Sequence, residues 1–246
     1  MSLSRRAALK HATVVAAGTA VVTWTGPQAI AATPSPSPDP VDISGALRRH
    51  KAEQERVYTG KPSKNGWEME KVADGGGTIW TRPLPGTALG GVQVRLGDVE
   101  TALVHVIRRF HYEIDELRRD DLIGWRRPGD VRKGLAESNQ ASGTAVQIRP
   151  GFYPSGQRGG FFANQVVVIR DILADCEGVV RWGGDDPKPD EALFYIDVKP
   201  GNEQLTQVAN KFRAWTATPG VGAGASADPF QPKRRQTAER LARRQS

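Results

Sequence analysis

The stretch SNQASGTAVQI, from Ser138 to Ile148, changes character halfway along. The part up to Gly143 is small and polar, as loops are, whereas TAVQI is rich in β-branched and apolar residues, as strands are. A second run of this kind, LFYIDV, begins at Leu193. We therefore expect a loop that leads into a strand over 144–149, and another strand over 193–198.

Several segments outside this stretch have the apolar spacing of helices. Over residues 98–119, apolar side chains recur at three- and four-residue steps, which places them on one face of a helix. Residues 164–177 have the same spacing, and Gly178 after them is a stop signal. Further helices are expected over 43–56 and 202–215, where they would flank the core.

Short runs with β-branched or aromatic residues, bounded by Gly and Pro, predict further strands over 91–96 and 178–182. Strands and helices mix without the regular βαβ rhythm that a parallel sheet requires. The sequence therefore predicts an α+β fold, with a small and mostly antiparallel sheet flanked by helices.

The first residues of the chain have the features of an export signal. SRRAALK, over Ser4–Lys10, carries paired arginines, residues 12–24 are free of charge, and residues 29–31 form an A-x-A cleavage site. SRRAALK resembles the twin-arginine signal, which exports folded cargo. An uncleaved membrane anchor needs about 20 apolar residues, and this run is too short. We expect residues 1–31 to be removed and the protein to be secreted or kept in the cell envelope.

Composition divides the rest of the chain into a domain and its extensions. A Pro- and Ser-rich linker over 32–41 precedes a domain over 42–215, which is followed by a linker rich in Gly, Ala and Pro over 216–232 and a basic tail over 233–246. Removal of the signal takes away three cations and lowers the formal net charge from +7 to +4.

The basic tail carries six Lys or Arg residues and one Glu, which is a charge of +5 on a nearly neutral body. Such a segment is either a solvated, flexible tail or a contact for a polyanion, here an anionic wall polymer or a membrane surface. The export signal and the lack of aromatic residues after Phe230 argue against nucleic acid as a partner. The sequence gives no signal for an oligomeric state.

The opening stretch and the run at Leu193 resemble a known family. Zinc D-alanyl-D-alanine carboxypeptidases and dipeptidases, among them the vancomycin-resistance enzymes VanX and VanY, carry S-x-H-x-x-G-x-A-x-D and, later, E/D-x-x-H just inside a strand. Ser138, Gly143 and Ala145 match the first motif, and Asp190 stands where the second has its catalytic acid. The resemblance covers about residues 75–215 and implies the hedgehog/D,D-peptidase fold.

The zinc ligands of that family are changed in this sequence. Gln140 and Leu193 stand at the two histidine positions, and Gln147 stands at the aspartate position. An amide is a poor zinc donor and an isobutyl group is none, whereas catalytic zinc needs three protein ligands. Without zinc, water does not reach the pKa of about 7 that makes it a nucleophile. We expect no zinc cofactor, and only a vestigial acid/base position at Asp190.

Other residues do not replace the missing ligands. His105 and His111 lie about 240° apart around the expected helix and cannot face one metal. Cys176 is expected to be a small core residue. An acidic cluster could hold Ca²⁺ or Mg²⁺, although a solvated acidic turn is the simpler interpretation. The cluster consists of Asp185, Asp186, Asp190, Glu191 and Asp197.

Two functions follow from the resemblance. The first is an exported cell-envelope protein that has lost zinc-dependent hydrolysis and binds peptidoglycan stem peptides or a related peptide. Arg126, in the segment GWRRP, resembles the family's carboxylate-binding arginine and would contact the substrate together with Ser138 and Ser142. The alternative is an active hydrolase that resembles a D-alanyl-D-alanine carboxypeptidase but has an unconventional site.

Overall fold

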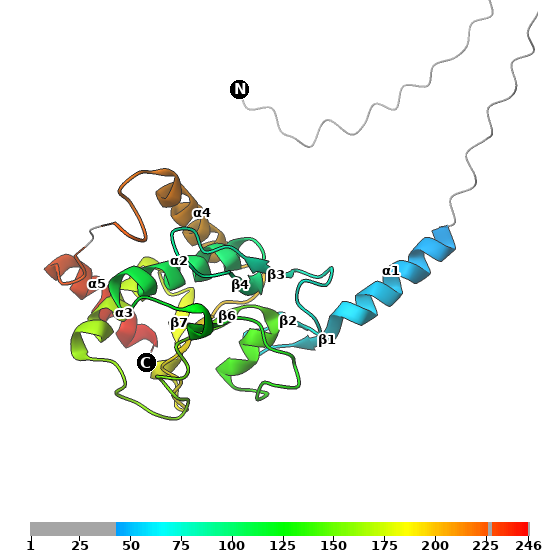
Figure 1. The fold of residues 1–246 in the computed structure, drawn as a ribbon, viewed down its shortest axis with the longest axis horizontal. Helices are drawn as coiled ribbons and strands as arrows, with labels where there is room; N and C mark the ends of the chain where they lie inside the picture. Colours follow the sequence, from blue (N-terminus) through cyan, green and yellow to red (C-terminus); the bar gives the residue numbers. More distant parts are fainter. Residues whose placement is uncertain (1–42, 226–227, 246) are drawn as a thin grey trace, which may run out of the picture. The chain divides into compact units, whose positions relative to one another are not determined.

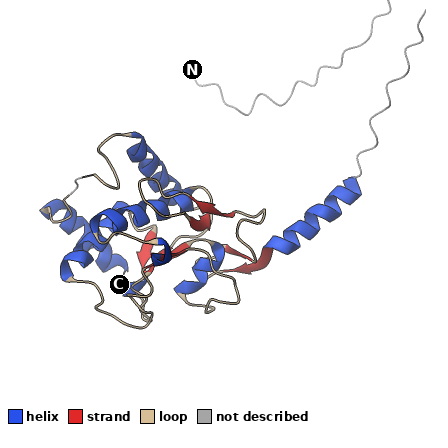
Figure 2. Ribbon diagram, in the orientation of Figure 1, coloured by secondary structure: helices blue, strands red, loops and turns tan. Residues whose placement is uncertain are grey.

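The structure is a computed structural model that describes residues 43–225 and 228–245 (Figure 1). The expected signal over 1–31 and the linker over 32–41 lie outside the described residues. Helices and short strands are mixed along the described chain (Figure 2). In chain order the elements are α1 (Ile43–Val57), β1 (Tyr58–Pro62), β2 (Glu68–Glu70), β3 (Ile79–Arg82), β4 (Val92–Arg95), α2 (Asp98–Glu113), the 3-10 turn η1 (Arg119–Asp121), β5 (Leu122–Ile123), the 3-10 segment η2 (Ala136–Ser142), β6 (Ala145–Ile148), α3 (Ala163–Asp175), β7 (Val180–Trp182), the 3-10 turn η3 (Gly183–Asp185), β8 (Leu193–Ile196), α4 (Glu203–Ala217) and α5 (Pro232–Gln245).

The strands form small antiparallel sheets. β1 pairs with β2, β3 pairs with β4, and the largest sheet has the strand order β5-β6-β8-β7. The strands expected over 91–96, 144–149, 178–182 and 193–198 correspond to β4, β6, β7 and β8. The expected α+β class with a small antiparallel sheet is therefore confirmed.

One face of the four-stranded sheet forms the core with α2 and α3. Val146, Phe194 and Trp182 are paired across β6, β8 and β7, and their side chains pack with those of both helices. The apolar stripe expected on α2 is buried here, including Leu103 and Phe110. Most of the apolar side chains that the sequence places at regular spacing are buried on this face of the sheet.

The second face of the same sheet carries the residues of the opening stretch. Successive side chains of a strand point to opposite faces, so Ala145 and Gln147 of β6 lie on the face away from α2 and α3. They stand opposite Tyr195 and Leu193 of β8. Ala136 of η2 is buried in one apolar cluster with three of these residues, so η2 covers this face.

Gly143 is the point at which η2 turns into β6. Its backbone is left-handed, with a φ of 68°, a conformation that favours glycine. A Cβ atom at this position would lie 2.7 Å from the backbone nitrogen of Arg95 and 2.9 Å from Cγ1 of Ile79. Both the conformation and the close packing therefore require glycine in the middle of the opening stretch.

The long helix ends earlier than its apolar spacing predicts. α2 ends at Glu113, whereas the predicted helix runs to Arg119. Beyond this end the backbone nitrogen of Leu117 donates to Nδ1 of His111, at 2.9 Å, which holds the chain in a turn. Leu117 still reaches the core from that turn. Its place in the apolar pattern therefore reflects burial and not continued helix.

The expectation that residues 43–56 flank the core is wrong. α1 exposes nearly all of its side chains, including the large apolar ones of Ile43 and Leu47. Its sequence is mostly charged and supplies too few apolar residues for a buried stripe. The helix expected over 202–215 does flank the core, because α4 packs against α2.

The C-terminal tail is a helix that packs on the domain, which corrects the expected domain end at residue 215. α5 lies along α3 (Figure 1). Ala238 and Leu241 of α5 are buried, and Nε2 of Gln245 donates to the carbonyl oxygen of Val180 at 3.1 Å. A stripe of so few apolar residues is hard to detect in a strongly basic segment.

In the described part of the chain, every helix is too short or too polar to cross a membrane.

Candidate functional site

The positions at which the zinc peptidases that the sequence resembles have their metal ligands meet around β6. Gln147 has two cross-strand neighbours, Leu193 on β8 and Ile123 on β5. Nε2 of Gln140 approaches the same row from η2, since it lies 3.4 Å from the carbonyl oxygen of Ile123 and 3.0 Å from that of Gly124. The structure therefore brings Gln140, Gln147 and Leu193 to one region of the second face.

These side chains do not fit a zinc ion. Nε2 of Gln147 donates to Oδ2 of Asp190, Nε2 of Gln140 donates to the main chain, and Leu193 has no donor atom. Protein zinc sites use imidazole, thiolate or carboxylate ligands. Within residues 43–225 and 228–245, no three His, Cys, Asp or Glu side chains are grouped so that they could hold a metal ion.

Asp190 is buried beside these positions. Its exposed fraction is 5%, and its Oδ1 has no hydrogen-bond partner among the described residues. Burial raises the pKa of Asp190 above the ordinary value, the side chain of Gln147 and the backbone N–H of Ala192 oppose this rise, and the charge of Glu137 adds to it. A carboxyl group whose pKa is raised keeps its proton to higher pH and can then donate a hydrogen bond.

Asp190 and Leu193 line a cavity of about 220 Å³, which we call the sheet cavity. Three cationic side chains also line it. They are Lys64, Arg132 and Lys188. Glu137 is a second buried carboxylate in the lining. Asp186, which is 6% exposed, is a third, so the sheet cavity combines three cationic side chains with three buried carboxyl groups.

Glu137 is a site residue that the sequence analysis does not single out. It is 7% exposed and lies between two arginines. The backbone nitrogen and Nε of Arg132 donate to its carboxylate, and Nη1 of Arg126 lies 3.5 Å from its Oε1. Arg126, expected to bind a substrate carboxylate, is thus paired with a carboxylate of the protein. The only sequence signal for Glu137 is its place directly before Ser138.

Ser138 and Ser142, expected to contact substrate, are buried against the loop over 63–65. Oγ of Ser138 accepts a hydrogen bond from the backbone nitrogen of Lys64 at 3.0 Å. Oγ of Ser142 lies 2.8 Å from the hydroxyl oxygens of both Ser63 and Thr144. Neither serine lines the sheet cavity. Their positions support a structural role.

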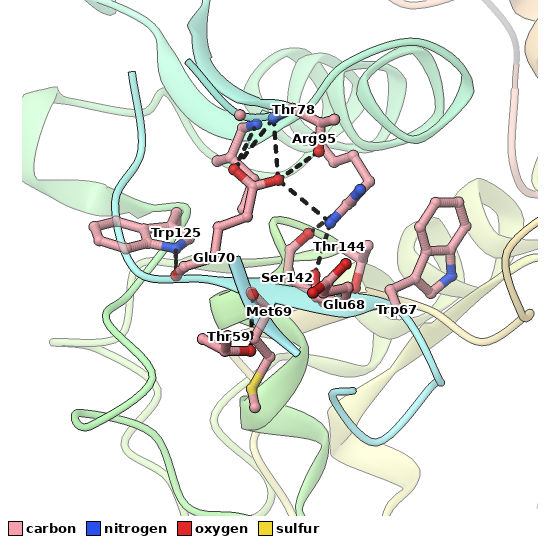
Figure 3. A network of polar contacts seen from close by, with 12 residues as sticks. Thr59, Trp67, Glu68, Met69, Glu70, Thr78, Arg95, Trp125, Ser142 and Thr144 are labelled. Carbon is pink, nitrogen blue, oxygen red and sulfur yellow. Dashed lines mark hydrogen bonds and ion pairs between the residues drawn. The ribbon is translucent and has the colours of Figure 1, made fainter. Parts of the chain in front are cut away.

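A second buried network fixes η2 from the other side (Figure 3). Glu70 is fully buried, accepts a hydrogen bond from the backbone nitrogen of Thr78 at 3.0 Å, and lies 3.5 Å from Nη2 of Arg95. Nε of Arg95 donates to the carbonyl oxygen of Ser142 at 3.0 Å. Nε1 of Trp125 donates to the carbonyl oxygen of Glu70 at 3.2 Å. This network therefore fixes both η2 and the segment around Trp125.

The acidic residues over 185–197 face donors of the protein itself. Oxygens that already accept such bonds are oriented away from a shared cation, so the alternative of a Ca²⁺ or Mg²⁺ site gains no support. The pairs are Asp185 with Arg170, Asp186 with Tyr195 and Arg181, Asp190 with Gln147, Glu191 with the backbone nitrogens of Gly159 and Gly160, and Asp197 with Arg181.

The remaining metal- or nucleophile-type residues lie away from the sheet cavity. His105 is buried, stacks on Phe212 with ring centroids 3.8 Å apart, and has its Nε2 3.8 Å from Asp175. His111 lies on the same helix but accepts a bond from the turn after α2. Cys176 is completely buried, and burial raises the pKa of its thiol. Its expected place in the core is confirmed.

Comparisons of this chain with protein-family models, with curated proteins and with solved structures gave no match. Its function is therefore inferred from the chemistry of the sheet cavity and from the motifs in the sequence.

Proposed function

We propose that this protein binds short peptides with a free terminal carboxylate, such as peptidoglycan stem peptides, in the sheet cavity, and that it does not hydrolyse them through zinc. The observation that carries the proposal is the lining of the cavity, in which three cationic side chains accompany the buried carboxyl groups of Glu137, Asp186 and Asp190. A peptide terminus presents the matching groups: a carboxylate, an amide N–H and a carbonyl oxygen.

The cationic side chains suit the carboxylate end of such a peptide. A guanidinium group can bind a carboxylate through two parallel charge-assisted hydrogen bonds. Arg132 lines the cavity, and its side chain is 59% exposed, so a ligand can reach it. Arg126 contacts the same Glu137 carboxylate as Arg132, with its Nη1 at 3.5 Å from Oε1.

The buried carboxyl of Asp190 suits the peptide group. Its Oδ1 lacks a partner among the described residues, although a buried polar atom without a hydrogen bond is costly. As a carboxylate it accepts a bond from a peptide N–H, and as an acid it donates to a carbonyl oxygen. Because protein atoms enclose this oxygen, a bound peptide supplies the missing partner only once the lining around Asp190 has shifted.

The proposal includes the hedgehog/D,D-peptidase fold and a place in the cell envelope. The fold is supported by the meeting of Gln140, Gln147 and Leu193 in one region, as the ligands of one metal would meet. Export is supported by SRRAALK, over Ser4–Lys10. Replacement of both arginines in that segment by lysine is expected to keep the protein in the cytoplasm on fractionation. A variant that is still exported would contradict this part of the proposal.

Calorimetric titration with a stem pentapeptide that ends in D-Ala-D-Ala tests the binding. Arg132→Gln removes a charge-assisted bond worth about 1.5–3 kcal/mol, so we expect the affinity to fall by about 10- to 100-fold. Arg119→Gln removes an exposed cation outside the lining and serves as the matched control, with an unchanged affinity. Equal affinities for the wild type and both variants would remove the sheet cavity as the binding site.

A second candidate function is hydrolysis without zinc, and the presence of Glu137 and Asp190 among the buried carboxyl groups of one cavity favours it. Asp190, whose pKa burial raises, would protonate the leaving group, while Glu137 would take a proton from the water that attacks. The water oxygen bonds to the cleaved carbon, and the leaving group departs with the proton of Asp190. Product release from peptidoglycan fragments in the presence of a chelator, lost in both Glu137→Gln and Asp190→Asn, would establish this function.

A further inference from the structure

The C-terminal helix α5 has an inner face bound to the protein and an outer face that carries positive charge. At 3.6 residues per turn, the inner residues fall within an arc of about 60°. They are Arg234, Ala238, Leu241 and Gln245, all buried or half-buried. Helix α5 therefore has two distinct faces. The side chains of the inner face contact the rest of the protein, whereas those of the outer face are exposed.

Charged contacts fix the inner face on α3. Nε of Arg234 lies 2.7 Å from Oδ1 of Asp171, and its Nη2 lies 2.6 Å from Oδ2. Arg109, which reaches the same place from α2, donates to Asp171 at 2.9 Å and to Asp175 at 2.7 Å. Because helices α2, α3 and α5 share these bonds, the orientation of α5 about its own axis is set.

The outer face, which we call the cationic face, consists of Lys233, Arg240, Arg243 and Arg244. These residues fall within an arc of about 100° on the side away from the inner face. All are exposed, and none of them forms an ion pair with another residue of the described chain. Arg235, in contrast, pairs with Glu239 at 3.7 Å. Among the described residues, no acidic side chain thus compensates the charges of the cationic face.

We infer that the cationic face binds a linear polymer that carries phosphate charges along its backbone. The four cations span about 16 Å along the helix at about 1.5 Å per residue, so one polymer strand can meet all of them. Contacts between phosphates and cations release counterions, which drives binding at moderate salt.

The chemistry of the cationic face favours a phosphate polymer without bases over a membrane or a single-stranded nucleic acid. A helix that lies on a bilayer inserts an apolar face, whereas the apolar side chains of α5, Ala238 and Leu241, are buried against the protein. Single-stranded nucleic acids gain affinity from stacking on aromatic side chains, and α5 has no aromatic residue. Only the ionic component of binding is therefore present on this face.

Titration of the full chain with long-chain inorganic polyphosphate tests the inference. A variant with Lys233→Gln, Arg240→Gln, Arg243→Gln and Arg244→Gln is expected to bind at least about tenfold more weakly. With about four phosphate contacts and a slope of about −0.7 each, a fourfold rise in salt weakens wild-type binding by about 50-fold. The inner face is unchanged in this variant, and circular dichroism checks that α5 stays folded.

The matched control removes four exposed cations elsewhere, with Arg48→Gln, Arg49→Gln, Lys61→Gln and Arg119→Gln. We expect it to bind within about twofold of wild type, because the cationic face is intact. An equal loss in both variants would show that only net charge matters, and absence of binding by the wild type would also overturn the inference. Tighter binding to phosphatidylglycerol vesicles or to an oligonucleotide would assign the face to a membrane or to nucleic acid.

Discussion

The side-chain nitrogen of Gln147 lies 2.9 Å from Oδ2 of Asp190 and donates a hydrogen bond to it. In the zinc peptidases that the sequence resembles, the residue at position 147 would be a metal ligand and the residue at position 190 the catalytic acid. Here the two side chains bind one another. The bond leaves Oδ1 of Asp190 buried and without a hydrogen-bond partner among the described residues.

Compared with the wild type, the Asp190→Asn variant is expected to be relatively more stable at neutral pH than at acid pH. The raised pKa means that the folded protein holds this proton more tightly than the unfolded chain, whose Asp pKa is about 3.9. Wild-type stability therefore falls as the pH rises from about 4 through the folded pKa, and the Asn variant avoids this loss. Urea unfolding between pH 4 and 8 measures the difference, with the exposed Asp120→Asn as control. A difference that does not change with pH would contradict the assignment.

Ser142→Ala is expected to lower the free energy of unfolding by about 1–3 kcal/mol, because it leaves buried partners of the hydroxyl unsatisfied. Peptide affinity should stay within about twofold, since Ser142 does not line the sheet cavity. Ser155→Ala, at an exposed serine in the cavity lining, should leave stability unchanged. Denaturation and calorimetry separate these effects. Loss of peptide binding by a stable Ser142→Ala variant would restore the serine to the substrate site.

Arg234→Met is expected to cost about 1–3 kcal/mol at neutral pH and to expose α5 to trypsin. Burial alone would raise the pKa of Asp175, but nearby His105 and the charges of Arg109 and Arg234 hold that pKa below its ordinary value. A lowered carboxyl pKa stabilises the fold above about pH 4 and stops doing so as the pH falls through the folded value. The difference between Arg234→Met and wild type should therefore shrink in acid.

Arg235→Met is the matched control for this measurement. Arg235 is exposed and pairs only with Glu239, and such surface pairs contribute about 0–1 kcal/mol. Equal trypsin sensitivity of the two variants would mean that Arg234 does not fasten α5.

The triple variant Gln140→His, Gln147→Asp and Leu193→His is expected to bind one zinc ion per chain. Residues 147 and 193 stand directly opposite each other, where Cβ atoms lie about 4.5–5.5 Å apart, and residue 140 approaches the same row. Metal analysis after dialysis measures this, and the double variant that keeps Leu193 should hold zinc more weakly because it has only two ligands. A folded triple variant without zinc would count against the resemblance to the zinc peptidases.

Much of the core could be predicted from the sequence, because periodic burial leaves a direct pattern. β6 and β8 have runs of β-branched or aromatic residues, and α2 and α3 have clear apolar stripes. The docking of α5 could not be predicted in this way, because its buried stripe is short and its position depends on Arg234, whose partners Asp171 and Asp175 are remote in sequence. Pairings of this kind leave no local pattern.

The sequence predicts some of the residues that line the candidate site, but not all of them. The motif indicated Gln140, Gln147, Leu193 and Asp190, and the structure brings these residues together. Glu137 was missed because its importance comes from burial in the sheet cavity. The roles of the motif serines depend on the loop over 63–65, which contacts them across a long sequence separation.

The central claim is that the sheet cavity binds a carboxylate-terminated peptide and leaves it intact. Its most direct test is one titration of the wild-type protein with the stem pentapeptide and with the same peptide as its C-terminal amide, followed by mass spectrometry of the recovered peptides. We predict saturable one-to-one binding of the acid, binding of the amide that is weaker by about tenfold or more because a charge-assisted bond is lost, and both peptides recovered unchanged. Equal affinity for acid and amide, or release of the terminal D-alanine, would contradict the account.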